Sequence, residues 1–118
     1  MIPHVEWWFK AATLLPGVTA AFVHAEAWLA SLALGHWPVP SLDDPKDLAT
    51  WPVHSLSWGL FLAMYPAAIV VMSTLASRWR TSASVARYRW WVGAFVASWS
   101  LFWWHNATYS GVWEWCAD

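Results

Sequence analysis

The stretch AATLLPGVTAAFVHAEAWLASLAL, residues 11–34, decides the fold class of this 118-residue chain. Glu26 is its only formally charged side chain. A bilayer core about 30 Å thick is crossed by about 20 helical residues, so the stretch is long and apolar enough to span a membrane as one helix. We therefore predict a transmembrane helix over residues 11–34.

Two further stretches share this character, SLSWGLFLAMYPAAIVVMSTLA at 55–76 and WWVGAFVASWSLFWWHNATYS at 90–110. Their apolar runs are continuous, whereas strands of a membrane barrel alternate apolar and polar side chains. The sequence predicts an all-α integral membrane protein with three transmembrane helices. Residues 1–118 then form a single membrane domain, with an outer loop over 35–54 and an inner loop over 77–89.

The charges of the two loops predict the orientation of the chain. Loop 77–89 contains arginines and no acid, whereas loop 35–54 contains three aspartates and one lysine. Cytoplasmic loops are enriched in Lys and Arg, so the arginine loop is expected inside. With three spans, the N-terminus is then cytoplasmic and the C-terminus outside. We expect a multi-pass protein of the inner membrane, either plasma or intracytoplasmic.

The composition supports a membrane protein and argues against nucleic-acid binding. Hydrophobic residues make up 59% of the chain and charged residues 11%, and there are 14 tryptophans. Soluble proteins carry about 25% charged residues. The formal net charge of -1 gives no electrostatic basis for nucleic-acid binding. Because Cys116 is the single cysteine, no disulfide can form within the chain.

Small residues spaced four apart predict how the helices pack. Close approach of helices in a bilayer needs such residues. They recur at Gly17, Ala21 and Ala25, at Gly59, Ala63 and Ala67, and at Gly93 and Ala97. The short arginine loop predicts that the second and third helices are antiparallel neighbours.

Three ionisable side chains within the predicted spans are candidate functional residues, namely His24, Glu26 and His105. Placing such a group in a bilayer costs about 2.5–3.5 kcal/mol on insertion scales, so each needs a role. His24 and Glu26 are two residues apart and should point to different helix faces. His105 shares a polar helix edge with Ser98 and Thr108.

Three interpretations of the histidines stay open. We favour neutral imidazoles that hydrogen bond to a neighbouring helix, to Glu26 or to water. The second is axial ligation of haem or of a chlorophyll by His24 or His105, although helical rise separates the two by about 5 Å in depth. The third is a metal site in the outer half. It would draw on His36, His54 and His105 with Asp43 or Asp47.

Residues 20–24, AAFVH, place Ala20 four before His24, and Trp113 and Trp115 follow the last span. This pattern resembles the bacteriochlorophyll-binding helices of purple-bacterial antenna polypeptides. Those chains span once, and His105 is preceded by Leu101 where the pattern has alanine. The three-span build resembles small multi-helix accessory subunits beside reaction centre and light-harvesting complexes. The resemblance implies bacteriochlorophyll or carotenoid at the contact with the partner, with haem as the alternative.

The sequence predicts a non-catalytic accessory subunit that packs against a larger energy-converting membrane complex. A photosynthetic reaction centre or light-harvesting assembly is preferred to a respiratory complex. His24 and His105 are the candidate tetrapyrrole ligands, and Trp28, Trp103 and Trp104 are candidate contacts for a pigment or partner. One alternative is a haem- or chlorophyll-binding subunit with a membrane histidine as axial ligand. The other is a small oligomeric transporter with Glu26 as its ion site.

Overall fold

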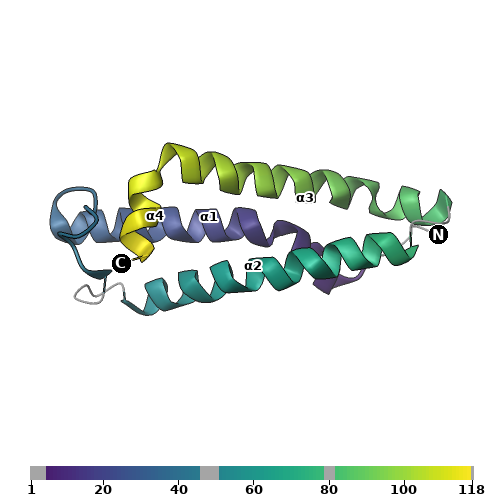
Figure 1. Cartoon of the computed structure of the whole chain (residues 1–118), viewed down its shortest axis with the longest axis horizontal. Helices are drawn as coiled ribbons and strands as arrows, with labels where there is room; N and C mark the ends of the chain where they lie inside the picture. The colour runs from purple at the N-terminus through teal and green to yellow at the C-terminus, as the bar shows by residue number, and fades with distance from the viewer. Residues whose placement is uncertain (1–4, 46–50, 79–81, 118) are drawn as a thin grey trace.

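The computed structural model describes residues 5–45, 51–78 and 82–117, and this part of the chain is an elongated helical bundle of 54 × 24 × 22 Å. Three long helices lie along its length, and a short fourth helix folds across one end (Figure 1). The helices are α1 (Trp7–Leu34), α2 (Trp51–Arg78), α3 (Ser82–Thr108) and α4 (Ser110–Ala117).

The prediction of an all-α fold is confirmed, but the prediction of three transmembrane helices is wrong. Only α1 and the Pro52–Arg78 part of α2 are long and apolar enough among the described helices to cross a membrane. The third stretch fails because it contains serines, His105 and Asn106, and because indole rings are less apolar than aliphatic side chains. The placement of the two termini on opposite sides required an odd number of spans, so it is withdrawn as well.

The helices are longer than the apolar stretches that predicted them. The first begins at Trp7 instead of residue 11, and the second begins at Trp51 instead of 55. The loop between α2 and α3 is therefore shorter than the predicted arginine loop over 77–89, since α3 already begins at Ser82 and includes Arg87 and Arg89. Gly35 ends the first helix in a left-handed conformation with φ of 79°, and its N–H donates to the Ser31 carbonyl.

The first helix, α1, is the centre of the bundle. Both α2 and α3 pack along α1. Helices α2 and α3 approach each other through aromatic rings such as those of Tyr65 and Trp99, whose centroids are 6.3 Å apart. The predicted small-residue stripes are largely incorrect, because Ala21, Ala63 and Ala97 are exposed. The alanines of α1 that do lie in contacts are Ala12, Ala20, Ala27 and Ala30.

Gly17 is the member of those stripes that does lie at a close helix contact. Its backbone N–H donates to the Ser98 Oγ on α3, at 2.7 Å. A Cβ atom at this position would lie 3.1 Å from that oxygen and 3.6 Å from a Leu101 methyl group. By contrast, a Cβ atom at Gly93 would meet nothing within 4 Å. The hydrogen bond therefore depends on the absence of a side chain at residue 17.

We expect Gly17→Val to destabilise the protein by about 1–3 kcal/mol, because the added methyl groups push α1 and α3 apart. Thermal unfolding followed by circular dichroism in detergent micelles measures the change. Gly93→Val, the same substitution in open space, is the matched control and should change stability by less than about 0.5 kcal/mol. Equal effects of the two substitutions would show that the Gly17 contact does not constrain the bundle.

A polar cluster joins the three long helices at the end where α1 begins. Glu6 precedes α1, Arg78 ends α2, and Tyr88 lies in the first half of α3. The Arg78 guanidinium donates to a Glu6 carboxylate oxygen at 2.5 Å and also to the Tyr88 hydroxyl, which in turn donates to the other Glu6 oxygen at 3.1 Å. The Tyr88 ring is buried against Phe9, with ring centroids 4.8 Å apart.

The contact between Glu6 and Arg78 should make the free energy of unfolding depend on pH. The Arg78 hydrogen bond, followed by one from the backbone, lowers the pKa of the Glu6 carboxyl below its ordinary value. The stabilisation is therefore complete above the unfolded pKa of about 4.3 and is lost as pH falls through the lower folded value. Thermal melts from neutral to acidic pH measure this effect. Wild type should be more stable than Glu6→Gln at neutral pH, and the difference in stability should disappear in acid. Glu114→Gln, at an exposed acid, should not change the pH profile, and a constant difference between wild type and Glu6→Gln would contradict the linkage.

Candidate functional site

The second polar cluster lies toward the opposite end of α1 and is centred on Glu26. This side chain is 0% exposed. It lies among apolar side chains of α1 and α4, and Ala27, Ala30 and Trp115 in that region are also 0% exposed. A carboxyl group in such surroundings needs hydrogen-bond donors, since burying it without them is strongly unfavourable.

His54, in the first turn of α2, supplies one donor to Glu26. Its Nδ1 lies 2.5 Å from the Glu26 Oε1, and both residues are buried. On the other side of the ring, the Trp58 indole N–H donates to the His54 Nε2 at 3.1 Å. An indole N–H can only donate, so Nε2 is the acceptor and the ring proton resides on Nδ1. His54 is therefore a neutral imidazole that donates its proton toward Glu26.

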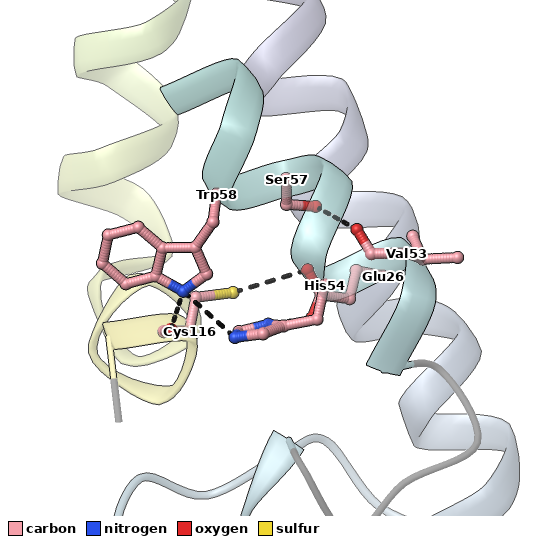
Figure 2. Close-up of polar contacts among 6 residues, drawn as sticks. All are labelled: Glu26, Val53, His54, Ser57, Trp58 and Cys116. Atoms are coloured by element: carbon pink, nitrogen blue, oxygen red, sulfur yellow. Dashed lines mark hydrogen bonds and ion pairs between the residues drawn. The ribbon is translucent and has the colours of Figure 1, made fainter. Parts of the chain in front are cut away.

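Cys116 on α4 completes the cluster (Figure 2). Its Sγ lies 3.8 Å from the Glu26 Oε2, and its carbonyl oxygen accepts a second contact from the Trp58 indole at 3.0 Å. Cys116 is held there because α4 folds back over α1, burying Val112 and Trp115 against Val23. Burial, and then the Glu26 carboxylate, raises the pKa of the Cys116 thiol, so the sulfur carries its proton at neutral pH.

A largely apolar cavity of about 230 Å³ lies beside the cluster. Ser57, Trp58 and Cys116 form part of its wall. The remaining lining comes from Val23, Phe61, Asn106, Trp113 and Ala117. Cys116 therefore borders free volume, whereas Glu26 and His54 are not among the residues that line the cavity.

The cluster brings together three side-chain types that bind metal ions. One ligand atom each from Glu26, His54 and Cys116 lies within 4.8 Å of the others, and all three residues are buried. Carboxylate, imidazole and thiolate are together typical of zinc and related divalent metals. Without a metal, the same arrangement is a buried network in which Glu26 accepts from His54 and from the thiol.

The two histidines predicted as tetrapyrrole ligands are brought together by α1 and α3. The His105 Nε2 lies 3.1 Å from the His24 Nδ1, and the Trp113 indole N–H donates to the His105 Nδ1 at 3.0 Å. Since the indole only donates, the His105 proton resides on Nε2 and is donated to His24. The Tyr109 ring stacks on the His105 ring, with ring centroids 4.8 Å apart. Axial ligation would have to break or reverse this hydrogen-bond chain, and tetrapyrrole binding stays a prediction.

The other predicted site residues are spread over the surface. Trp28, Trp103 and Trp104 are 54%, 58% and 57% exposed, so their rings are available for contact, and their proposed pigment or partner role stays a prediction. The alternative metal set is not assembled, because His36 pairs with Asp43 at 3.9 Å while His54 and His105 lie in different clusters. Asp47 lies outside the described residues.

Sequence reasoning assigned Glu26 to a site but missed its partners. His54 was assigned to the outer loop, although Pro52 just before it is typical of the first turn of a helix and indicates an earlier start for α2. Trp113 and Trp115 were placed only after the last predicted span, but Trp115 is 0% exposed and Trp113 is half-buried. The short helix that positions Cys116 was not predicted.

No protein-family model matches this chain, and neither does any curated protein or solved structure.

Glu26→Leu should destabilise the protein by about 1–3 kcal/mol, because it leaves the buried His54 Nδ1–H without its carboxylate acceptor. The double variant Glu26→Leu with His54→Leu should recover most of this loss, since both polar partners are then replaced by apolar groups. Thermal unfolding in detergent micelles measures all of these variants. Glu114→Leu, at an exposed acid on α4, is the control and should stay within about 0.5 kcal/mol of wild type. If the effects of Glu26→Leu and His54→Leu simply add, the two side chains are not coupled.

Proposed function

We propose that this chain is a non-catalytic accessory subunit, embedded in a membrane through α1 and α2, that packs against a larger membrane protein complex. The support for the membrane is the outer surface of α2, where large apolar side chains have few partners within the chain. Leu56, Leu62, Ile69 and Met72 are each 59% exposed or more. Such a surface is covered by lipid or by another protein.

The observation that carries the partner proposal is the exposure of three tryptophans on α3. Trp90, Trp103 and Trp104 are 74%, 58% and 57% exposed on a helix that is less apolar than a membrane span. Tryptophan is enriched in the central parts of protein contacts. We therefore assign these tryptophans to the partner and the exposed apolar side chains of α2 to lipid.

The partner that we propose is an energy-converting complex of the inner membrane, with the chain as a multi-pass subunit. The resemblance of residues 20–24, AAFVH, to a bacteriochlorophyll-binding pattern supports a photosynthetic reaction centre or light-harvesting assembly ahead of a respiratory complex. A pigment-binding or haem-binding subunit is the alternative, and the proximity of His24 and His105 to the Trp104 and Tyr109 rings supports it. A transporter with Glu26 as its ion site has less support, because Glu26 is hydrogen bonded and lies away from any surface.

Co-purification from the native membrane tests this proposal. The tagged wild-type chain, extracted in mild detergent, should elute at the size of a large complex, whereas Trp103→Ala with Trp104→Ala should elute mainly as free chain. Leu62→Ala with Ile69→Ala on α2 is the matched control and should stay in the complex. Native gels and mass spectrometry measure the partner.

Elution of the folded wild-type chain as a lone monomer would contradict the accessory-subunit proposal. Solubility of the chain after carbonate washing of the membranes would contradict membrane embedding. An absorption spectrum of the purified complex separates the alternatives, since a Soret or near-infrared band that stays with the isolated chain would favour a cofactor-binding subunit.

A further inference from the structure

We propose that Glu26, His54 and Cys116 bind one divalent metal ion of borderline softness, with Zn²⁺ as the expected ion. The three residues come from α1, α2 and α4, so the metal would join three helices at one point (Figure 2). This inference does not rest on the proposed function, because the site lies within a single chain.

The ligand types select the class of metal. A thiolate disfavours Mg²⁺ and Ca²⁺, which prefer oxygen ligands, and one sulfur, one imidazole nitrogen and one carboxylate oxygen suit Zn²⁺ or Co²⁺. All three residues are buried, and Cys116 belongs to the apolar cluster of α1 and α4. An exposed cluster of acids would lack both properties.

The three ligand atoms lie within 4.8 Å of one another, so side-chain movements of about 1 Å bring them to the spacing that a metal needs. Metal–ligand bonds of about 2.0–2.3 Å place neighbouring tetrahedral ligands roughly 3.3–3.8 Å apart. The Cys116 Sγ and the Glu26 Oε2 already lie 3.8 Å apart. The His54 Nδ1 lies 2.5 Å from the Glu26 Oε1, so the imidazole has to withdraw by about 1 Å for the metal to take the place of the shared proton.

The proton balance also fits. On binding, Cys116 releases its thiol proton to solvent, and the His54 proton leaves Nδ1 while Nε2 gains one, so the imidazole stays neutral. The Trp58 indole then no longer donates to Nε2, but it already reaches the Cys116 carbonyl oxygen at 3.0 Å. With the carboxylate and the thiolate, a divalent ion forms a complex of zero net charge, which suits an apolar environment. One proton is released for each metal bound.

The cavity beside Cys116 provides access and a fourth coordination position. Its volume of about 230 Å³ is enough for water at the metal, and Ser57 and Trp58 line it together with Cys116. Three protein ligands with one open position are typical of zinc sites that hold water or an exchangeable ligand. Binding would also fix α4 against α1 and α2.

Cobalt substitution of the purified full-length chain in detergent tests the site directly. Titration with Co²⁺ should give a near-ultraviolet sulfur-to-cobalt band and visible bands of tetrahedral strength, saturating at one ion per chain, and Zn²⁺ should abolish them. Because Cys116 is the single cysteine, any thiolate-to-cobalt band must come from it. Absence of that band in folded wild-type protein would overturn the proposal.

Ligand variants establish the other two residues. Cys116→Ser should remove the sulfur band, and Glu26→Gln and His54→Gln should each weaken Co²⁺ binding by at least about tenfold, because even outer-shell partners contribute 10–100-fold. His36→Gln, which changes an exposed histidine, is the matched control and should bind like wild type. If the Glu26→Gln or the His54→Gln variant keeps its helical structure and still binds Co²⁺ with wild-type affinity, the three-ligand site is wrong.

A second assay needs no variant and so does not depend on variant folding. Zn²⁺ should slow maleimide modification of Cys116 in the wild-type chain, and a chelator should restore the rate. Mg²⁺ at the same concentration is the control and should have no effect. Equal modification rates with Zn²⁺, with Mg²⁺ and with chelator would contradict metal binding by this thiol.

Discussion

The buried carboxyl group of Glu26 is the constraint on which the end of the bundle depends. It lies on α1, the helix that contacts every other one, and has no exposed surface. A carboxyl group in this position requires hydrogen-bond donors, and here they come from other segments. The donors are His54 of α2 and the thiol of Cys116 of α4. The first turn of α2 and the apolar packing of α4 on α1 bring these two donors to the carboxyl group.

The bundle is joined by polar contacts near both ends and by close packing between them. Glu6 and Glu26 are separated by about 30 Å of helix, and each accepts hydrogen bonds from two other segments. Between them, the hydrogen bond from Gly17 to Ser98 holds α3 against α1. When the surroundings are as apolar as the helix surfaces, apolar burial alone does little to select a partner helix. A few directional contacts at fixed depths then determine how the helices align.

The sequence predicted the helices better than the site. Long apolar runs indicated the three long helices, and Gly35 ends the first because it readily adopts a left-handed conformation. The number of membrane spans was incorrect because apolar length was weighed without the polarity of the α3 side chains. The pairing of His24 with His105 could not be predicted, since helical rise from assumed span centres gave unequal depths while α3 is shifted along α1. The contact between Glu26 and Cys116 joins residues far apart in sequence, and short-range patterns carry no information about it.

Tryptophan has a specific role in both histidine clusters. In one, Trp58 donates to His54, which donates to Glu26, and in the other, Trp113 donates to His105, which donates to His24. In a neutral imidazole, one ring nitrogen carries the proton and donates, while the other accepts. An indole N–H can only donate, so the nitrogen that it contacts must be the acceptor. Each tryptophan therefore fixes the tautomer and directs the opposite N–H toward a chosen acceptor. The high tryptophan content thus contributes fixed hydrogen-bond direction inside the bundle, in addition to the aromatic surface outside it.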